Sequence, residues 1–74
     1  MSKVRADIEI GKRAYEEVMR LYSNESSRAI SRRIGCEYKT VNSWRTGYSP
    51  SAIYLSRLHE MGADVIWILT GVRK

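Results

Sequence analysis

Residues 26 to 47, SSRAISRRIGCEYKTVNSWRTG, hold two short helical patterns with a single glycine between them. The serines at the start suit a helix N-cap, and Gly35 suits the left-handed residue that follows a helix. Apolar residues at spacings of three and four mark an inward side on each pattern: Ile30, Ile34, Val41 and Trp44. A chain of 74 residues has room for one small core, so these two helices must pack against it.

The same combination of caps, apolar spacings and glycines predicts the other helices. We expect five in all, at about residues 6–22, 27–34, 38–46, 52–61 and 65–70. Gly11 lies on the apolar side of the first helix, where it either frays the first turns or permits close packing against a neighbour. No segment alternates polar and apolar residues between turn signals. The predicted fold class is therefore all-α, a compact five-helix bundle that forms a single domain over residues 1–74.

The formal net charge of +5 is concentrated in one part of the chain. Between Arg28 and Arg57, six basic residues face one acid, Glu37, whereas the rest of the chain has seven residues of each sign. Such a stretch predicts a polyanionic partner, either nucleic acid or an anionic membrane surface. The N-terminus has no signal-peptide pattern and no long apolar run, and the one cysteine cannot form an internal disulfide. We therefore expect a cytoplasmic protein.

The sequence lacks the patterns of catalytic and metal sites. One histidine, His59, and one cysteine, Cys36, cannot build a metal site, and we expect a solvated histidine and a small buried cysteine. Glu16 and Glu17 stand at helical spacing from arginines, which predicts surface ion pairs. The sequence contains no glycine-rich phosphate loop, paired-carboxylate arrangement or catalytic triad. We expect no enzymatic activity, no cofactor, no metal and no small-molecule ligand.

The second helix of the central pair has a polar side opposite its apolar one. At about 100° per residue, that side carries Lys39, Asn42, Ser43 and Thr46. Such groups suit base edges in a DNA major groove, because lysine can donate to guanine, an amide can pair with adenine, and small hydroxyl residues allow close approach. Tyr38 can reach a base edge or a thymine methyl. Phosphate contacts are expected from Ser27, Arg28, Thr40, Arg45, Thr46 and Tyr48. An N-terminal arm with Lys3 and Arg5 could lie along a groove.

With these residues in place, the chain resembles the Cro/CI-like phage repressors, the lambda-repressor-like helix-turn-helix DNA-binding domains. The resemblance covers about residues 10–71 and rests on Ala29-Ile30-Ser31, Ile34-Gly35-Cys36, Thr40-Val41-Asn42-Ser43-Trp44 and the segment DVIWILTG at residues 64–71. It implies a five-helix bundle with the helix-turn-helix at about 27–46, binding to operator DNA as a symmetric dimer, and base contacts from Tyr38, Lys39, Asn42 and Ser43. The chain departs from the family at Ser31, where alanine is common, and at Glu37, where a serine or threonine cap is common.

The last predicted helix, residues 65–70, is almost entirely apolar. So short a helix cannot bury every side in a small domain, and we expect Val65, Trp67 and Ile68 to form a homodimer interface, while Trp44 belongs to the core. The combined prediction is a sequence-specific, double-stranded-DNA-binding transcriptional regulator in the bacterial host cytoplasm, associated with the nucleoid. It most resembles a phage or prophage Cro/CI-type repressor that binds an inverted-repeat operator as a dimer. The alternative is an antitoxin-like or other helix-turn-helix module that acts mainly through a protein partner. Membrane binding is disfavoured, because the basic residues do not follow one long amphipathic helix.

Overall fold

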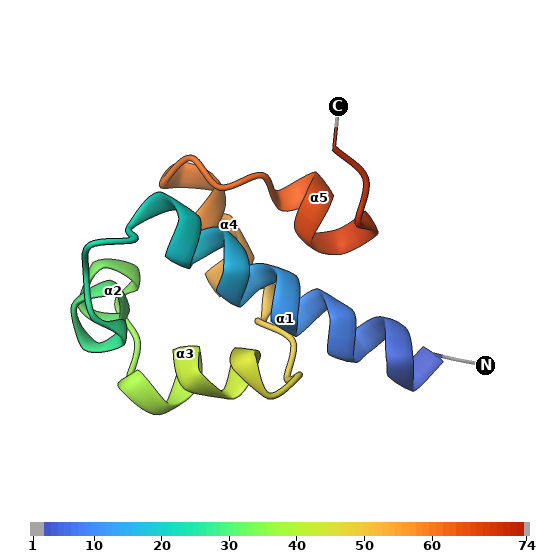
Figure 1. The fold of residues 1–74 in the computed structure, drawn as a ribbon, viewed down its shortest axis with the longest axis horizontal. Helices are drawn as coiled ribbons and strands as arrows, with labels where there is room; N and C mark the ends of the chain where they lie inside the picture. The colour runs from blue at the N-terminus through green and yellow to red at the C-terminus, as the bar shows by residue number, and fades with distance from the viewer. Residues whose placement is uncertain (1–2, 74) are drawn as a thin grey trace.

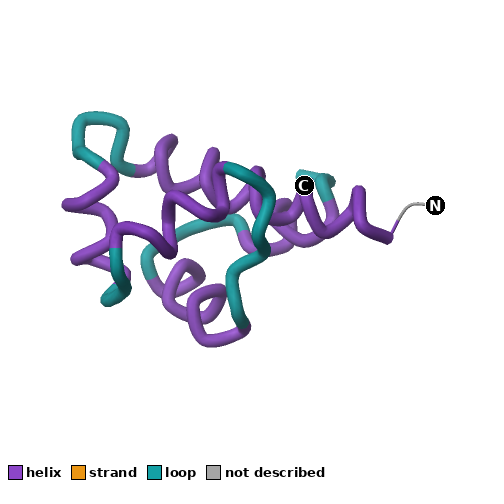
Figure 2. The backbone as a smooth tube through the Cα atoms, turned by 90° about the horizontal axis from the view of Figure 1, so that it is seen from below, coloured by secondary structure: helices purple, strands orange, loops and turns teal. Residues whose placement is uncertain are grey.

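The longest helix, α1 (Lys3–Leu21), runs through the middle of the molecule, with α3 and α5 on opposite sides of it (Figure 1). The computed structural model describes the backbone of residues 3–73 and the side chains of residues 9–73. The other helices are α2 (Ser27–Ile34), α3 (Tyr38–Arg45), α4 (Ala52–Glu60) and α5 (Val65–Thr70). The described backbone contains no strand (Figure 2), which confirms the prediction of an all-α fold with five helices.

Helix α1 begins earlier than the sequence predicted, at Lys3. Lys3 and Arg5, which were expected to form an arm, therefore lie within the helix, and their side chains fall outside the described residues. The other four helices begin at the predicted residues, and two of them, α2 and α5, are capped by a side chain, whereas Glu37 before α3 and Ser51 before α4 make no side-chain capping bond. Ser26 accepts a hydrogen bond from the Ala29 N–H at 3.2 Å, and Asp64 accepts one from the Trp67 N–H at 3.0 Å. Both satisfy backbone donors that a helix N-terminus otherwise leaves unpaired.

The core lies where α1, α2, α3, α4 and α5 meet. Its buried apolar side chains come from every helix and from the connection before α5: Ala14, Val18, Ile30, Ile34, Val41, Trp44, Leu58, Ala63 and Ile68. Trp44 is the largest of them and is only 1% exposed, as the sequence predicted. Its ring centroid lies 6.2 Å from that of Tyr54, so α3 is anchored to α4 through an aromatic pair.

Gly11 is the point of closest approach between α1 and the connection that follows α3. It is buried, and a Cβ atom at this position would lie 2.4 Å from the carbonyl oxygen of Tyr48 and 2.9 Å from the carbonyl carbon of Gly47. Of the two roles considered for Gly11, the structure supports close packing, since only a residue without a side chain fits against that backbone. The contact fixes the end of α3 against α1.

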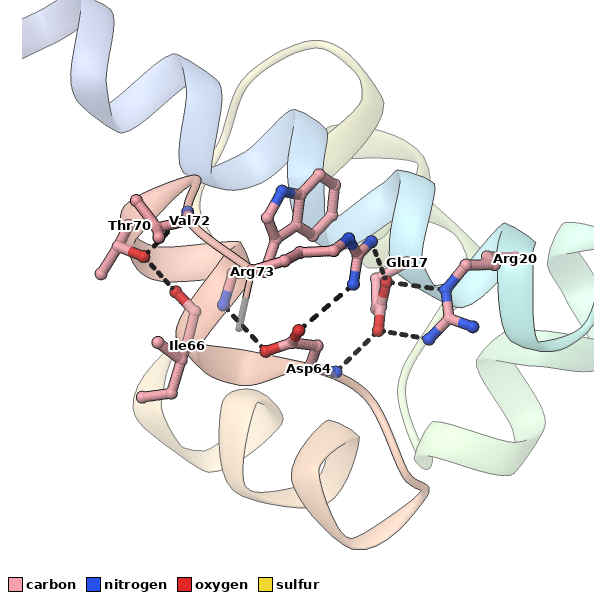
Figure 3. Close-up of polar contacts among 8 residues, drawn as sticks. Glu17, Arg20, Asp64, Ile66, Thr70, Val72 and Arg73 are labelled. Atoms are coloured by element: carbon pink, nitrogen blue, oxygen red, sulfur yellow. Dashed lines mark hydrogen bonds and ion pairs between the residues drawn. The ribbon is translucent and has the colours of Figure 1, made fainter.

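Glu17, in the second half of α1, is wholly buried, so the prediction that it forms a surface ion pair is wrong. Its carboxylate accepts hydrogen bonds from Arg20 at 3.1 and 2.7 Å, from the Asp64 backbone N–H at 2.7 Å and from Arg73 at 3.2 Å (Figure 3). The bonds from Arg20 outweigh the effect of burial and, with those from Asp64 and Arg73, lower the pKa of Glu17 to about 2. This cluster ties α1 to both ends of the α5 segment.

Candidate nucleic-acid interface

Helices α2 and α3 are joined by a tight turn whose geometry depends on three residues. Ser31 in α2 is 2% exposed, and its hydroxyl donates to the Ser27 carbonyl at 2.7 Å, so this small residue is buried with its polar group paired. Gly35 has φ 86°, and its N–H bonds to the Ser31 carbonyl at 2.9 Å, which confirms the left-handed C-cap. Arg57 from α4 donates to the carbonyls of Ile34 at 3.0 Å and Gly35 at 3.2 Å. These bonds hold the turn rigid.

Helix α3 is two-sided in the way that its sequence predicted. Val41 and Trp44 are buried, whereas Lys39 and Thr46 are exposed and Asn42 is half-buried. Ser43 and Thr40 are half-buried on the flanks of the outward side. The outward side of α3 therefore carries a cation, an amide and hydroxyl groups on a helix that the core holds in place.

Hydrogen bonds within α3 determine what its polar groups can still offer to a ligand. The Ser43 hydroxyl donates to the Thr40 carbonyl at 2.6 Å, and the Thr46 hydroxyl donates to the Ser43 carbonyl at 2.8 Å. Both oxygens keep lone pairs and so act as acceptors. Arg45 donates from Nε to the Asn42 Oδ1 at 3.2 Å. Because arginine has no acceptor, this contact identifies Oδ1 as the atom facing Arg45 and leaves both Asn42 N–H donors available.

The N-termini of α2 and α3 lie close to each other. The Arg28 guanidinium, on the first turn of α2, stacks over the Tyr38 ring, on the first residue of α3, with its carbon 4.6 Å from the ring centroid. Ser27 precedes Arg28 and is half-buried, whereas Glu37 precedes Tyr38 as the N-cap of α3 and is exposed. The Glu37 side chain makes no capping hydrogen bond, so it does not replace the serine or threonine cap.

At the other end of α3, Tyr48 is 70% exposed, while its backbone N–H bonds to the Ser43 carbonyl at 3.1 Å. Arg45, three residues earlier, is exposed on the last turn of the helix. The close contact with Gly11 fixes the backbone that carries Tyr48. The structure thus places expected phosphate-binding side chains at both ends of α3.

The basic stretch carries less free charge than its sequence suggests. Arg33 forms a two-pronged ion pair with Glu25, at 2.8 and 2.6 Å, and Arg57 serves the turn between α2 and α3. The four basic residues of that stretch outside these contacts are all exposed: Arg28, Arg32, Lys39 and Arg45. Arg32 was not among the predicted site residues, although its position on α2, one turn after Arg28, could have suggested it.

Cys36 follows the left-handed glycine and is half-buried, packed against the core. Burial raises the pKa of its thiol, with Glu37 adding to the effect and Arg57 opposing it. A thiol in this environment stays protonated near neutral pH and is a poor nucleophile. His59 is exposed on α4, as the sequence predicted. In the described part of the chain, no group of three or more His, Cys, Asp or Glu side chains is placed to hold a metal ion.

Helix α5 does not present the side that was expected for a dimer. Ile68 is completely buried, so its prediction as an interface residue is wrong. Arg13 donates from Nε to the Ile68 carbonyl at 2.9 Å, and α5 packs against α1. Val65 and Trp67 are half-buried, and the guanidinium carbon of Arg73 lies 4.2 Å from the Trp67 ring centroid.

Other apolar side chains of this region are exposed, and they lie three residues apart on α5 and just beyond it. The exposed fraction is 55% for Ile66, 42% for Leu69 and 65% for Val72. The sequence could not distinguish them from Ile68, because five consecutive apolar residues contain no polar residue that marks the outer side.

Comparison with models of known protein families, with curated proteins and with solved structures finds no significant match to this chain. Among the helices of residues 3–73, none has the length and apolar content needed to cross a membrane.

Proposed function

We propose that this chain is a sequence-specific, double-stranded-DNA-binding transcriptional regulator in which α2, the following turn and α3 act as a helix-turn-helix. The two-sided character of α3 carries the proposal. Val41 and Trp44 hold the helix against the core, and the opposite side offers donors and acceptors to the solvent. A recognition helix in a major groove requires this combination of rigid support and exposed hydrogen-bonding groups.

The base-contacting residues of the proposal are Lys39, Asn42 and Ser43. Lys39 is exposed and can donate to guanine O6 or N7, and Asn42 has both amide N–H groups available for an acceptor on a base edge. The Ser43 hydroxyl oxygen accepts, because its hydrogen is used by Thr40. Backbone phosphates are contacted from both sides of α3, by Ser27, Arg28, Thr40, Arg45, Thr46 and Tyr48.

The regulator acts as a homodimer on an inverted repeat, in the manner of the Cro/CI-type phage repressors that the sequence resembles. Its interface combines Trp67 and Val65, at its half-buried edge, with the exposed Ile66 and Leu69. Two recognition helices would then enter successive major grooves about 34 Å apart, with half-sites about ten base pairs apart from centre to centre. The protein works where DNA lies, in the bacterial cytoplasm on the nucleoid. We propose no catalysis, cofactor or membrane contact for this chain.

The first test is selection of binding sites from a pool of random DNA duplexes. We expect an enriched inverted repeat with half-sites about ten base pairs apart. Binding should weaken with salt by about 0.9 log units per tenfold change for each phosphate contact. If the protein enriches no sequence and binds no duplex at low salt, it is not a DNA-binding regulator. The better explanation is then a helix-turn-helix module that acts through a protein partner.

The second test separates base contacts from phosphate contacts. Asn42→Ala should weaken binding to the selected duplex by about 1–3 kcal/mol and relax preference at one base pair. Arg28→Ala should weaken binding to selected and random duplexes alike. Arg33→Ala is the matched control, since it removes an arginine from the same helix whose charge Glu25 already neutralises. If Asn42→Ala reduced binding to both kinds of duplex equally, the assignment of α3 as the recognition helix would fail.

A further inference from the structure

The stack between Arg28 and Tyr38 joins the first turns of two different helices. Arg28 is exposed, and Tyr38 is 38% exposed, so the contact lies at the surface and not in the core. It occurs at the end of α3 where the proposed interface begins. A cation held over an aromatic face is stabilised by the ring quadrupole, and this limits the rotamers of a side chain that is otherwise free.

Contact with a ring face does not use up the hydrogen-bond donors of arginine. A guanidinium has five N–H donors, so an arginine held over a ring can still donate to a phosphate. Among residues 9–73, no carboxylate pairs with Arg28 and no hydrogen bond uses its donors. Arg28 therefore keeps its full charge and all its side-chain donors for a ligand.

A second arginine–tyrosine stack in the same protein shows the contrast. The Arg33 guanidinium carbon lies 4.7 Å from the Tyr22 ring centroid, nearly the same distance, but Glu25 binds Arg33 with both carboxylate oxygens. In that contact, the charge of Arg33 is already neutralised by Glu25 of the same chain. The stack of Arg28 on Tyr38 has the same cation and the same ring without the anion, so an external anion can complete it.

From this geometry we propose that Tyr38 is a positioning residue that acts through Arg28, and that it is not a base-reading residue as its sequence position suggested. The Tyr38 ring holds the Arg28 guanidinium in place for one DNA phosphate beside the N-terminus of α3. This inference rests on the proposed DNA-binding function and deepens it. The contact fixes the register of α3 on the duplex and adds no sequence preference of its own.

The test is a double-mutant cycle with the variants Tyr38→Leu, Arg28→Ala and the two combined. Binding is measured at one salt concentration on the duplex selected from the random pool and on a duplex of unrelated sequence. Tyr38→Leu should weaken binding to both duplexes by the same two- to fivefold, and it should cause no further loss when Arg28 is already alanine. Tyr38→Phe, which keeps the ring, should bind like the original chain. Arg33→Ala removes the contact between Arg33 and Tyr22, in which Glu25 already pairs with the arginine, and it should leave both affinities unchanged.

The outcomes distinguish this inference from the function on which it rests. A chain that binds neither duplex overturns both. A chain that binds DNA, but in which Tyr38→Leu weakens only the selected duplex or has the same effect with and without Arg28, overturns this inference alone and restores Tyr38 as a base-reading residue. Far-ultraviolet circular dichroism of each variant confirms that the helices remain, which is expected because both side chains lie at the surface.

Discussion

Replacing Glu17 with glutamine tests whether the buried carboxylate of α1 anchors α5. The side chain keeps its shape but loses its charge. Its amide N–H₂ replaces one of the two oxygens and so faces a donor of Arg20 together with either Arg73 or the Asp64 backbone N–H. The pKa of Glu17 is lowered from 4.5 to about 2, which at about 1.4 kcal/mol for each pH unit corresponds to about 3 kcal/mol of stability at neutral pH. Because its arginine partners are about half exposed, we expect Glu17→Gln to lower the free energy of unfolding by about 2–3 kcal/mol.

The pH dependence of this loss gives a sharper test than its size. A carboxyl group whose pKa is lower in the folded state stabilises the fold above its unfolded pKa, here 4.5, and this stabilisation disappears as the pH falls toward about 2. The difference in unfolding free energy between the original chain and Glu17→Gln should therefore be constant from pH 7 to pH 5. It should then shrink until most of it is gone near pH 2.

Urea unfolding followed by circular dichroism at pH 7, 5, 4, 3 and 2 measures this difference. The neighbouring Glu16 is exposed and supplies the matched control, since Glu16→Gln makes the same change in net charge. We expect that variant to stay within about 0.5 kcal/mol of the original chain. Equal effects from the two variants, or a Glu17→Gln difference that does not change between pH 7 and pH 2, would refute the role assigned to Glu17.

Five further substitutions test the packing around α3 and the two sides of α5. Gly11→Ala should lower the unfolding free energy by about 1–3 kcal/mol in urea titrations, because its Cβ would lie 2.4 Å from a backbone oxygen; a gain, which helix propensity alone would give, contradicts the close packing. Arg57→Ala should cost about 0.5–1.5 kcal/mol through the loss of its hydrogen bonds to two turn carbonyls, whereas Arg32→Ala, which removes no such bond, should have almost no effect. Ile66→Ser should shift sedimentation equilibrium toward monomer at unchanged stability, whereas Ile68→Ala should cost about 2–5 kcal/mol; a dimer unaffected by Ile66→Ser would exclude this side of α5 from the interface.

The features that were predictable from the sequence depend on residues close together in the chain. Ser26 caps α2 through a residue three positions away, and Gly35 ends the same helix through a residue four positions away. The two sides of α3 follow from helical spacing alone, which is why Trp44 and Lys39 were placed on opposite sides correctly. The candidate interface was predictable to that extent.

The errors concern contacts between distant parts of the chain. Glu17 was predicted to pair at the surface because an arginine stands three residues away, but its other partners lie 47 and 56 positions further along. Arg33 and Arg57 were counted as free charge, although Glu25 neutralises one and carbonyl groups bind the other. Spacing along one helix cannot reveal such partners, because they meet only after the helices have packed.

The sequence by itself determined the number of helices, the caps at Ser26, Gly35 and Asp64, and the polar outward side of α3, since these follow from propensity and periodicity within about one turn of the chain. Only the tertiary structure decided which cations remain free, which side of α5 is exposed and what Tyr38 touches. Arg28 and Tyr38 stand ten positions apart and on different helices, so their contact exists only because the core fixes the angle of the turn between α2 and α3. The polar groups on the outward side of α3 follow from residues close together in the sequence, whereas the positions of these groups relative to the other helices are set by packing of the core.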